Sequence, residues 1–356
     1  MDHTEELLKT LTEASGVPGY EEEVRRLLRA YLEPAAQIEQ DRLGSLIARR
    51  PGRSDRPRVA LAAHMDEIGF MVRYITKEGC LKFVPLGGWW DQVLLGQRVI
   101  VKTHRGDIPG VIGAKPPHVL KEEERNKVVP KAEMYIDIGA TSRAEAEAAG
   151  VRSGDPVVPA SPFAVMASGR TYLAKALDDR VGCALMVEVL QGLAQEALPN
   201  ALYGVATVQE EVGLRGAITS AHVVEPDVAI ILDVDIAGDV PGIEEDENAI
   251  ALGKGPVLLL YDAAMIPNLR LRDLVIAVAE EEGIFLQFSA LTAGATDGGR
   301  IHLHGEGVPT VVLGVPTRHI HSHGAIMHRS DYDHALRLIQ AVVRRLDAEM
   351  VARLAQ

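Results

Sequence analysis

The sequence predicts an α/β fold, a mixed sheet flanked by helices, interrupted by a small inserted β-barrel. Two patterns in the sequence support this prediction. In the C-terminal half, long helical patterns alternate with short apolar strands, as in a sheet covered on both faces. From about residue 67 to residue 158, short extended runs with glycine-containing turns replace this alternation. We therefore expect residues 1–66 and 159–356 to form an α/β domain around an inserted β-domain at 67–158.

The N-terminal segment predicts two amphipathic helices and then a strand. Both helices show apolar residues at helical spacing: Leu7, Leu8 and Leu11 in the first, and Val24, Leu27, Leu28 and Tyr31 in the second. The turn at 16–19 separates the two helices. An apolar strand is expected at 59–63.

The insert predicts short strands and one short helix. The extended runs lie at 68–76, 81–84, 98–102, 110–112 and 134–138. A helix is expected at 143–149, with Ser142 and Glu145 spaced as a capping box.

The remaining chain predicts alternating helices and strands. Strands are expected at 201–208, 228–232, 256–261, 284–288 and 310–315. Helices are expected at 181–193, at 269–281 and from about Tyr332 onward.

Composition excludes several classes of protein. Lys and Arg number 37 and Asp and Glu 50, so the net charge of −13 argues against nucleic-acid or anionic-membrane partners. The two cysteines, Cys80 and Cys183, match neither a disulfide framework nor a cysteine zinc site. Neither a signal peptide nor an apolar run of membrane-spanning length is recognisable. We expect a soluble cytoplasmic protein.

Residues that bind metals or transfer protons follow four predicted strands and open one helix. They are His64 and Asp66, Glu210 and Glu211, Asp233, and His319 and His321 after strands, and Asp178 and Asp179 at the helix start. Open α/β sheets bind ligands at the carboxyl ends of their strands, so these side chains are expected to meet at one edge.

Histidine with aspartate and glutamate, without cysteine, is the ligand set of catalytic Zn²⁺, Co²⁺ or Mn²⁺ sites. A two-metal hydrolase also needs a further carboxylate that moves protons. The adjacent Glu210 and Glu211 suit this division, because one can bind metal while the other transfers protons. Each group has an ordinary interpretation too. Asp178 and Asp179 are also typical of a helix cap, and Glu210, Glu211 and Asp233 of turns or first helical turns. His302 and His304 repeat the spacing of His319 and His321, but we assign them a structural role.

Several segments resemble the tetrahedral (TET) aminopeptidases, a family that includes glutamyl aminopeptidases and chains labelled endoglucanase. The segments run in the family's order: GVPGYE at 16–21, AHMDEIG at 63–69, ALDDR at 176–180, VQEEVGLRGA at 208–217, LDV at 232–234, ATD at 295–297 and RHIHS at 318–322. The resemblance implies a zinc-peptidase-like α/β domain with a PDZ-like barrel. It also implies a hydrolase that removes N-terminal residues from peptides with two divalent ions, Zn²⁺ or Co²⁺.

The resemblance also implies residue roles. Five residues would bind metal: His64 and Asp233 at one ion, Glu211 and His321 at the other, and Asp178 bridging both. Glu210 would be the general base that activates the water, and Asp66 would accept the second N–H of the His64 ring and so orient it. The peptide bond between Asp178 and Asp179 would be cis.

Two positions depart from the family pattern. An aromatic residue is common where His319 stands, so His319 competes with His321 as a ligand. Asp235 replaces a smaller or hydroxyl residue, which changes the charge near the metals.

Two other functions stay open from the sequence. A glycoside hydrolase needs two carboxylates and usually an aromatic platform, whereas aromatic residues make up only 4% of the chain. A non-catalytic assembly protein would hold the metals in closed structural sites.

Oligomerisation is the expected role of the insert, which supplies none of the expected ligands. It contains Trp89 and Trp90, the only tryptophans, and tryptophan is enriched at interface hot spots. In similar enzymes this domain forms dimers that assemble into a hollow dodecamer, so we expect a homo-oligomer.

Overall fold

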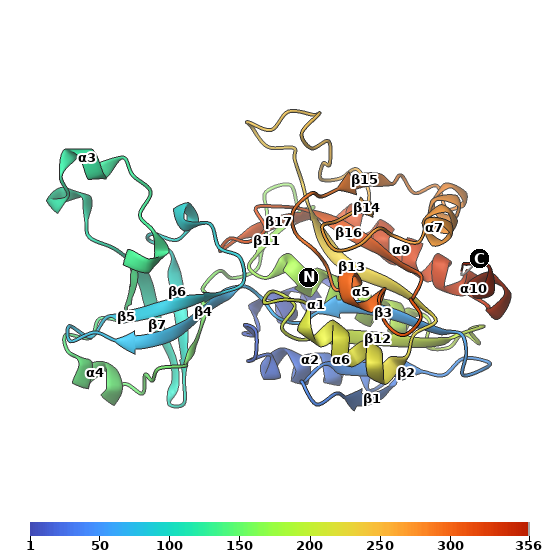
Figure 1. The fold of residues 1–356 in the computed structure, drawn as a ribbon, viewed down its shortest axis with the longest axis horizontal. Helices are drawn as coiled ribbons and strands as arrows, with labels where there is room; N and C mark the ends of the chain where they lie inside the picture. The colour runs from blue at the N-terminus through green and yellow to red at the C-terminus, as the bar shows by residue number, and fades with distance from the viewer. Residues whose placement is uncertain (355–356) are drawn as a thin grey trace.

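The computed structural model describes residues 1–354 and confirms the predicted fold class. A mixed sheet flanked by helices forms the larger part, and a closed β-barrel projects beyond one side of it (Figure 1). The barrel is inserted after strand β3 (Arg58–His64), and the chain returns from it to the sheet before helix α5 (Leu177–Gly192).

The centre of the sheet consists of four parallel strands. Their order is β12 (Ala201–Thr207), β3, β13 (Val228–Ile236) and β16 (Thr310–Arg318). Both faces of β3 and β12 are buried, which explains why these segments are almost continuously apolar.

Antiparallel strands extend the sheet on both sides. They are β1 (Gln37–Gln40) and β2 (Leu46–Arg50) next to β12, and β17 (Ala325–His328), β11 (Thr171–Ala174) and β10 (Ala164–Val165) beyond β16. β14 (Val257–Tyr261) pairs with β16 and with the short strand β15 (Gln287–Ala290).

Helices cover both faces of the sheet and enclose two hydrophobic cores (Figure 1). The larger core lies under α1 (His3–Glu13), α2 (Glu22–Leu32), α5, α7 (Leu269–Glu281), α9 (Arg329–Arg345) and α10 (Ala348–Leu354). The opposite core lies under α6 (Arg215–Val224) and the short helix α8 (Gly298–Ile301). No helix within residues 1–354 is both long and apolar enough to cross a membrane.

The barrel has six antiparallel strands around its own core. The strands are β4 (Gly69–Ile75), β5 (Leu81–Leu86), β6 (Arg98–Thr103), β7 (Gly106–Gly113), β8 (Tyr135–Asp137) and β9 (Pro156–Pro159), and two short helices, α3 (Glu122–Arg125) and α4 (Arg143–Ala148), lie between them. Trp89 is buried in this core, where it stacks on Phe70 with ring centroids 4.8 Å apart. Trp90, 61% exposed, is on the surface, so of the two tryptophans only Trp90 is available to an interface.

Two local predictions need adjustment. Asp233 was expected after a strand but lies within β13, because pairing with β16 continues to Ile236 after pairing with β3 ends at Ile231. At α4, Ser142 accepts from the Glu145 amide, as expected of a cap, but the Glu145 carboxylate accepts from the Thr141 amide instead of closing the capping box.

Candidate active site

The carboxyl ends of the parallel strands bring together the side chains that the sequence singled out. His64 is the last residue of β3, and Glu210 and Glu211 follow β12 in a loop before α6. Asp178 lies at the start of α5, and His321 follows β16. Strand ends from distant parts of the sequence therefore supply one cluster.

Asp178 is at the centre of this cluster. Its Oδ1 lies 3.0 Å from Nε2 of His64, and its Oδ2 lies 3.3 Å from Nε2 of His321. Oε1 of Glu211 is 3.5 Å from the same His321 nitrogen. One carboxylate thus faces a different histidine with each oxygen, as a bridging ligand would.

Asp178 and Asp179 divide between the two interpretations that the sequence left open. The Asp179 carboxylate accepts from the Gly182 amide at 2.9 Å, so it caps α5, while Asp178 points into the cluster. Asp179 also accepts from the His64 amide at 3.1 Å. The peptide bond between the two aspartates is cis, as the family resemblance implied.

Asp66 acts differently from the expectation. The second ring nitrogen of His64 bonds to the main-chain oxygen of Asp66 at 3.0 Å, while the Asp66 carboxylate is 3.7 Å away. That fully buried carboxylate accepts instead from the amides of Glu210 at 3.0 Å and Glu211 at 3.1 Å. Its side chain therefore fixes the loop that carries the two glutamates, and its main chain orients the histidine.

Glu210 lies beside the cluster without a close contact to either Asp178 or His321. Its Oε2 lies 4.0 Å from Nε2 of His64, and its side chain is 10% exposed. It is close to the cluster but outside the Asp178–His64–His321 contacts.

Asp233 belongs to a second group of ligand atoms that shares His64. One ligand atom each of His64, Asp179 and Asp233 lie within 4.8 Å of one another, as do those of His64, Asp178 and Glu211. The expected ligands thus lie together, with Asp179 as an additional carboxylate in reach.

Burial and mutual repulsion perturb the acids strongly. Burial raises the pKa of Glu211 to about 8 and of Asp233 to about 8, and the charge of Asp178 adds to both. Burial, with the charges of Asp297 and Asp233, also places the pKa of Glu210 well above its usual range. Such a group of buried carboxylates is stable in its charged form only beside cations.

The histidines respond in the opposite direction. Burial opposes a charge on His321, but hydrogen bonding to Asp178 and the charge of Glu211 raise its pKa to about 9. Burial would raise the pKa of Asp178, yet hydrogen bonds from His321 and His64 hold it below its usual range.

His319 lies apart from the cluster. Its side chain is exposed and lines a cavity of about 1000 Å³ beside His321. The structure therefore places His321, and not His319, against Asp178. His302 ends α8 on the other side of the sheet, where its ring bonds to the Gly298 carbonyl, and the His304 ring faces that of His222.

Asp235 and Asp297 are buried acids near the cluster. Ser289 donates to one Asp235 oxygen and Thr207 to one Asp297 oxygen, and the second oxygen of each is without a partner among the described residues. Burial raises the pKa of both to about 6.

Sequence reasoning missed a buried ion cluster behind the site. Lys175 binds Glu67 at 2.6 Å, and Arg180, fully buried, lies 3.6 Å from the same carboxylate. Arg180 also donates to the main-chain oxygens of Met65 and Ala14. A charged Arg180 directly before the uncharged run at 181–187 was the available signal.

The barrel contacts the cluster through a glycine turn that follows β5. A Cβ atom on Gly87 would lie 3.1 Å from Glu211 Oε2, and one on Gly88 would lie 3.0 Å from His321 Nδ1. The insert therefore forms part of the wall of the site without providing a ligand.

The donor set fits divalent cations. It combines imidazole nitrogens with carboxylate oxygens and contains no thiolate. A buried Glu211 oxygen, Oε1, also has no hydrogen-bond partner among the described residues, although a carboxylate oxygen removed from water normally has one. These residues therefore form candidate groups for binding metal ions.

The family model described as M42 glutamyl aminopeptidase matches residues 44–338 of this chain. The chain belongs to the M42 glutamyl aminopeptidase family. It is therefore an aminopeptidase of a metal-dependent peptidase family. Two curated relatives support this: the FrvX protein of Escherichia coli K12 is 45% identical over 97% of this chain and 96% of its own, and the glutamyl aminopeptidase of Lactococcus lactis is 37% identical over 97% of each.

Solved structures agree with this M42 assignment. The TET aminopeptidase from a Thaumarchaeota archaeon (SCGC AB-539-E09) is 51% identical, with a TM-score of 0.97 over 99% of this chain and 98% of its own. PhTET1-12s, described as a dodecamer, is 34% identical, with a TM-score of 0.86 over 97% of this chain and 100% of its own.

Proposed function

We propose that this M42 enzyme hydrolyses N-terminal residues from peptides with two divalent ions, Zn²⁺ or Co²⁺, at the cluster centred on Asp178. The observation that carries the proposal is the placement of the two Asp178 oxygens against His64 and His321, with Glu211 beside His321. A bridging carboxylate with terminal ligands on each side is what a two-metal hydrolase needs.

The proposed ligands divide into two sets around Asp178. His64 and Asp233 would hold one ion, and Glu211 and His321 the other. Bound there, the ions would lower the pKa of a water molecule and polarise the scissile carbonyl.

Glu210 is the proposed general acid and base. Its carboxylate lies next to the proposed ligands, 4.0 Å from Nε2 of His64, and burial raises its pKa, which makes it a stronger proton acceptor. It would take a proton from the attacking water and deliver it to the departing amine. The Asp66 carboxylate would support this transfer by holding the Glu210 amide in place.

Glycoside hydrolysis is the rival reaction, since a structural relative from Thermotoga maritima, 31% identical, is described as an endoglucanase. Imidazoles occupy the contacts of Asp178, so its carboxylate is not available to flank a sugar bond. A non-catalytic assembly protein is the other rival. It does not account for Glu210, a carboxylate beside the ligands that a closed structural site would not need.

The catalytic proposal is tested by removing and restoring metal. Chelation followed by dialysis should abolish cleavage of a panel of aminoacyl-nitroanilides, and added Zn²⁺ or Co²⁺ should restore it at about two ions per chain by elemental analysis. The panel should include glutamyl and lysyl substrates, because relatives carry both names. Full activity in protein with less than about 0.1 ion per chain would overturn the proposal. Cleavage of cello-oligosaccharides instead of peptides would favour the rival enzyme.

We further propose that the chain forms a homo-oligomer, a dodecamer built from dimers through the barrel. The solved relative PhTET1-12s is a dodecamer, and exposed Trp90 provides an apolar anchor on the barrel of this chain. Enclosed active sites would restrict the enzyme to short or unfolded peptides. Light scattering should report a dodecamer with metal and a dimer after chelation. A fully active monomer at micromolar concentration would contradict this.

A further inference from the structure

We propose that Glu21 is a positioning residue that holds the main chain in front of Glu210. This inference rests on the proposed role of Glu210 as general acid and base. Glu21 is the residue before α2, far from the glutamates in sequence, and it is not among the proposed ligands.

Three consecutive amides of the Glu210 loop point at two buried carboxylates. The Gln209 amide donates to Glu21 Oε1 at 3.1 Å, and the next two amides, of Glu210 and Glu211, donate to the Asp66 carboxylate. Glu21 therefore holds the residue that immediately precedes the general base, and Asp66 holds the base itself and the ligand after it.

The loop needs this restraint at Gln209. Its φ of 56° is in the left-handed region, which is strained for a residue with a Cβ unless neighbouring contacts fix it. A hydrogen bond from its amide to a carboxylate is the kind of contact that offsets this strain. Without it, residue 209 is free to relax toward negative φ and to rotate the Glu210 main chain.

The Glu21 side chain does not serve the helix that it precedes. It stands at the N-cap of α2, yet its side chain makes no capping hydrogen bond there. The residue is only 4% exposed, and burial together with the charge of Asp66 raises its pKa. Burying a carboxylate beside another is unfavourable, so the two amides it accepts, from Gly19 at 2.8 Å and from Gln209, account for its position.

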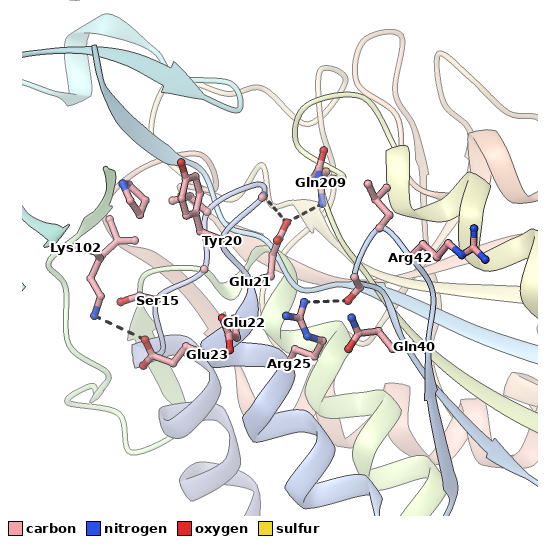
Figure 2. A pocket seen from close by; sticks show the side chains of 17 residues that line it. Ser15, Tyr20, Glu21, Glu22, Glu23, Arg25, Gln40, Arg42, Lys102 and Gln209 are labelled. Carbon is pink, nitrogen blue, oxygen red and sulfur yellow. Dashed lines mark hydrogen bonds and ion pairs between the residues drawn. The ribbon is translucent and has the colours of Figure 1, made fainter. Parts of the chain in front are cut away.

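A cavity of about 400 Å³ reaches Glu21 from the surface. Figure 2 shows the Glu21 carboxylate beside Gln209, and Glu22 and Arg25 also line the cavity. Because the cavity is lined by polar side chains, shortening residue 21 admits water and does not force the core to collapse. The inference can therefore be tested without unfolding the protein.

The test compares Glu21→Ala with Glu21→Gln and with Glu22→Ala. Glutamine keeps the Oε1 acceptor that both amides use, whereas alanine removes it. Glu22 is the adjacent, exposed glutamate of the same helix and cavity, so its variant is a matched control for charge. Each variant is assayed with saturating metal for kcat, KM, metal content and melting temperature.

We expect Glu21→Ala to lower kcat roughly 10-fold to 100-fold, as loss of an outer hydrogen-bond partner does, with KM and metal content unchanged. Metal content is kept because Asp66 still holds the Glu211 amide. Glu21→Gln and Glu22→Ala should stay within about 3-fold of the wild-type kcat. This pattern would separate positioning from a general loss of stability. A merely destabilised enzyme would not recover its kcat when glutamine replaces alanine at residue 21.

Three results would overturn the inference: wild-type kcat in Glu21→Ala, a loss of kcat in proportion to lost metal, or equal losses in the alanine and glutamine variants. Glu210→Gln is measured in parallel. If Glu210→Gln is inactive while Glu21→Ala is normal, only the positioning role fails. If Glu210→Gln is fully active, the proposed role of Glu210 fails first.

Discussion

Substituting Asp66 by asparagine tests how the glutamate loop is held. Asp66 is fully buried, and its two oxygens accept one amide each, from Glu210 at 3.0 Å and from Glu211 at 3.1 Å. Asparagine has the same shape but presents an NH₂ group where the second oxygen was. One amide keeps an acceptor, and the other faces a donor at a position with no exposure to solvent.

The size of the effect follows from these two contacts. A hydrogen bond to a charged group contributes about 1.5–3 kcal/mol, and an unsatisfied buried donor costs about 1–3 kcal/mol. If these two effects together raise the activation free energy by about 2–4 kcal/mol, kcat/KM falls roughly 30-fold to 1,000-fold. We also expect weaker metal binding, because the Glu211 main chain is displaced.

The assay measures kcat/KM at saturating metal, the metal dissociation constant by competition with a chelating dye, and thermal unfolding. Asp41→Asn is the matched control. Asp41 is also a buried aspartate, and it accepts the amides of Leu43, Gly44 and Ser45 in the turn between β1 and β2. It should lower the melting temperature without changing metal affinity. Wild-type kcat/KM in Asp66→Asn, or equal losses of metal affinity in both variants, would refute the reasoning.

Three further predictions concern the cluster. Glu210→Gln should keep both metals and lower kcat by about 10²–10⁴-fold; near wild-type kcat would exclude Glu210 as the base. His321→Ala should lower bound metal by elemental analysis and His319→Ala should not, since only His321 faces Asp178; the reverse result would exchange the two histidines. Chelated protein should melt at progressively lower temperature from pH 5 to pH 8. Glu211 and Asp233 have a pKa of about 8 when folded and near 4 when unfolded, so the folded state holds more protons and is destabilised as pH rises. A melting temperature that rises over this range in calorimetry would contradict the raised pKa of the two carboxyl groups.

The sequence was sufficient to predict which strand ends meet. An apolar run buried on both faces and followed at once by His64 or by Glu210 is a local pattern, and the parallel topology then places those residues at one edge. The fold class follows from the same patterns, because strand and helix periodicities depend on neighbours along the chain.

What could not be predicted depends on contacts distant in sequence. Whether Asp178 or Asp179 caps the helix depends on where His64 lies, and both are the same residue type. The family resemblance assigned the Asp66 carboxylate to the His64 ring, but the two amides that reach this carboxylate come from a loop more than 140 residues away. Glu21 ends the GVPGYE segment of the resemblance, but nothing in the sequence linked its carboxylate to Gln209, because an acid before a helix is ordinary.

The glycine turn after β5 makes the insert an unsuitable module for exchange between proteins. Gly87 and Gly88 pack against Glu211 and His321 so closely that any side chain at Gly88 would press on the imidazole. A transplanted barrel, however well it folds, would have to reproduce that turn so that it leaves the same room for His321 and Glu211. Substitutions elsewhere on the barrel do not meet this constraint. The residues of the insert are therefore constrained unequally: the turn is fixed by the cluster that it touches, and the remaining barrel surface is free to vary with whatever it binds.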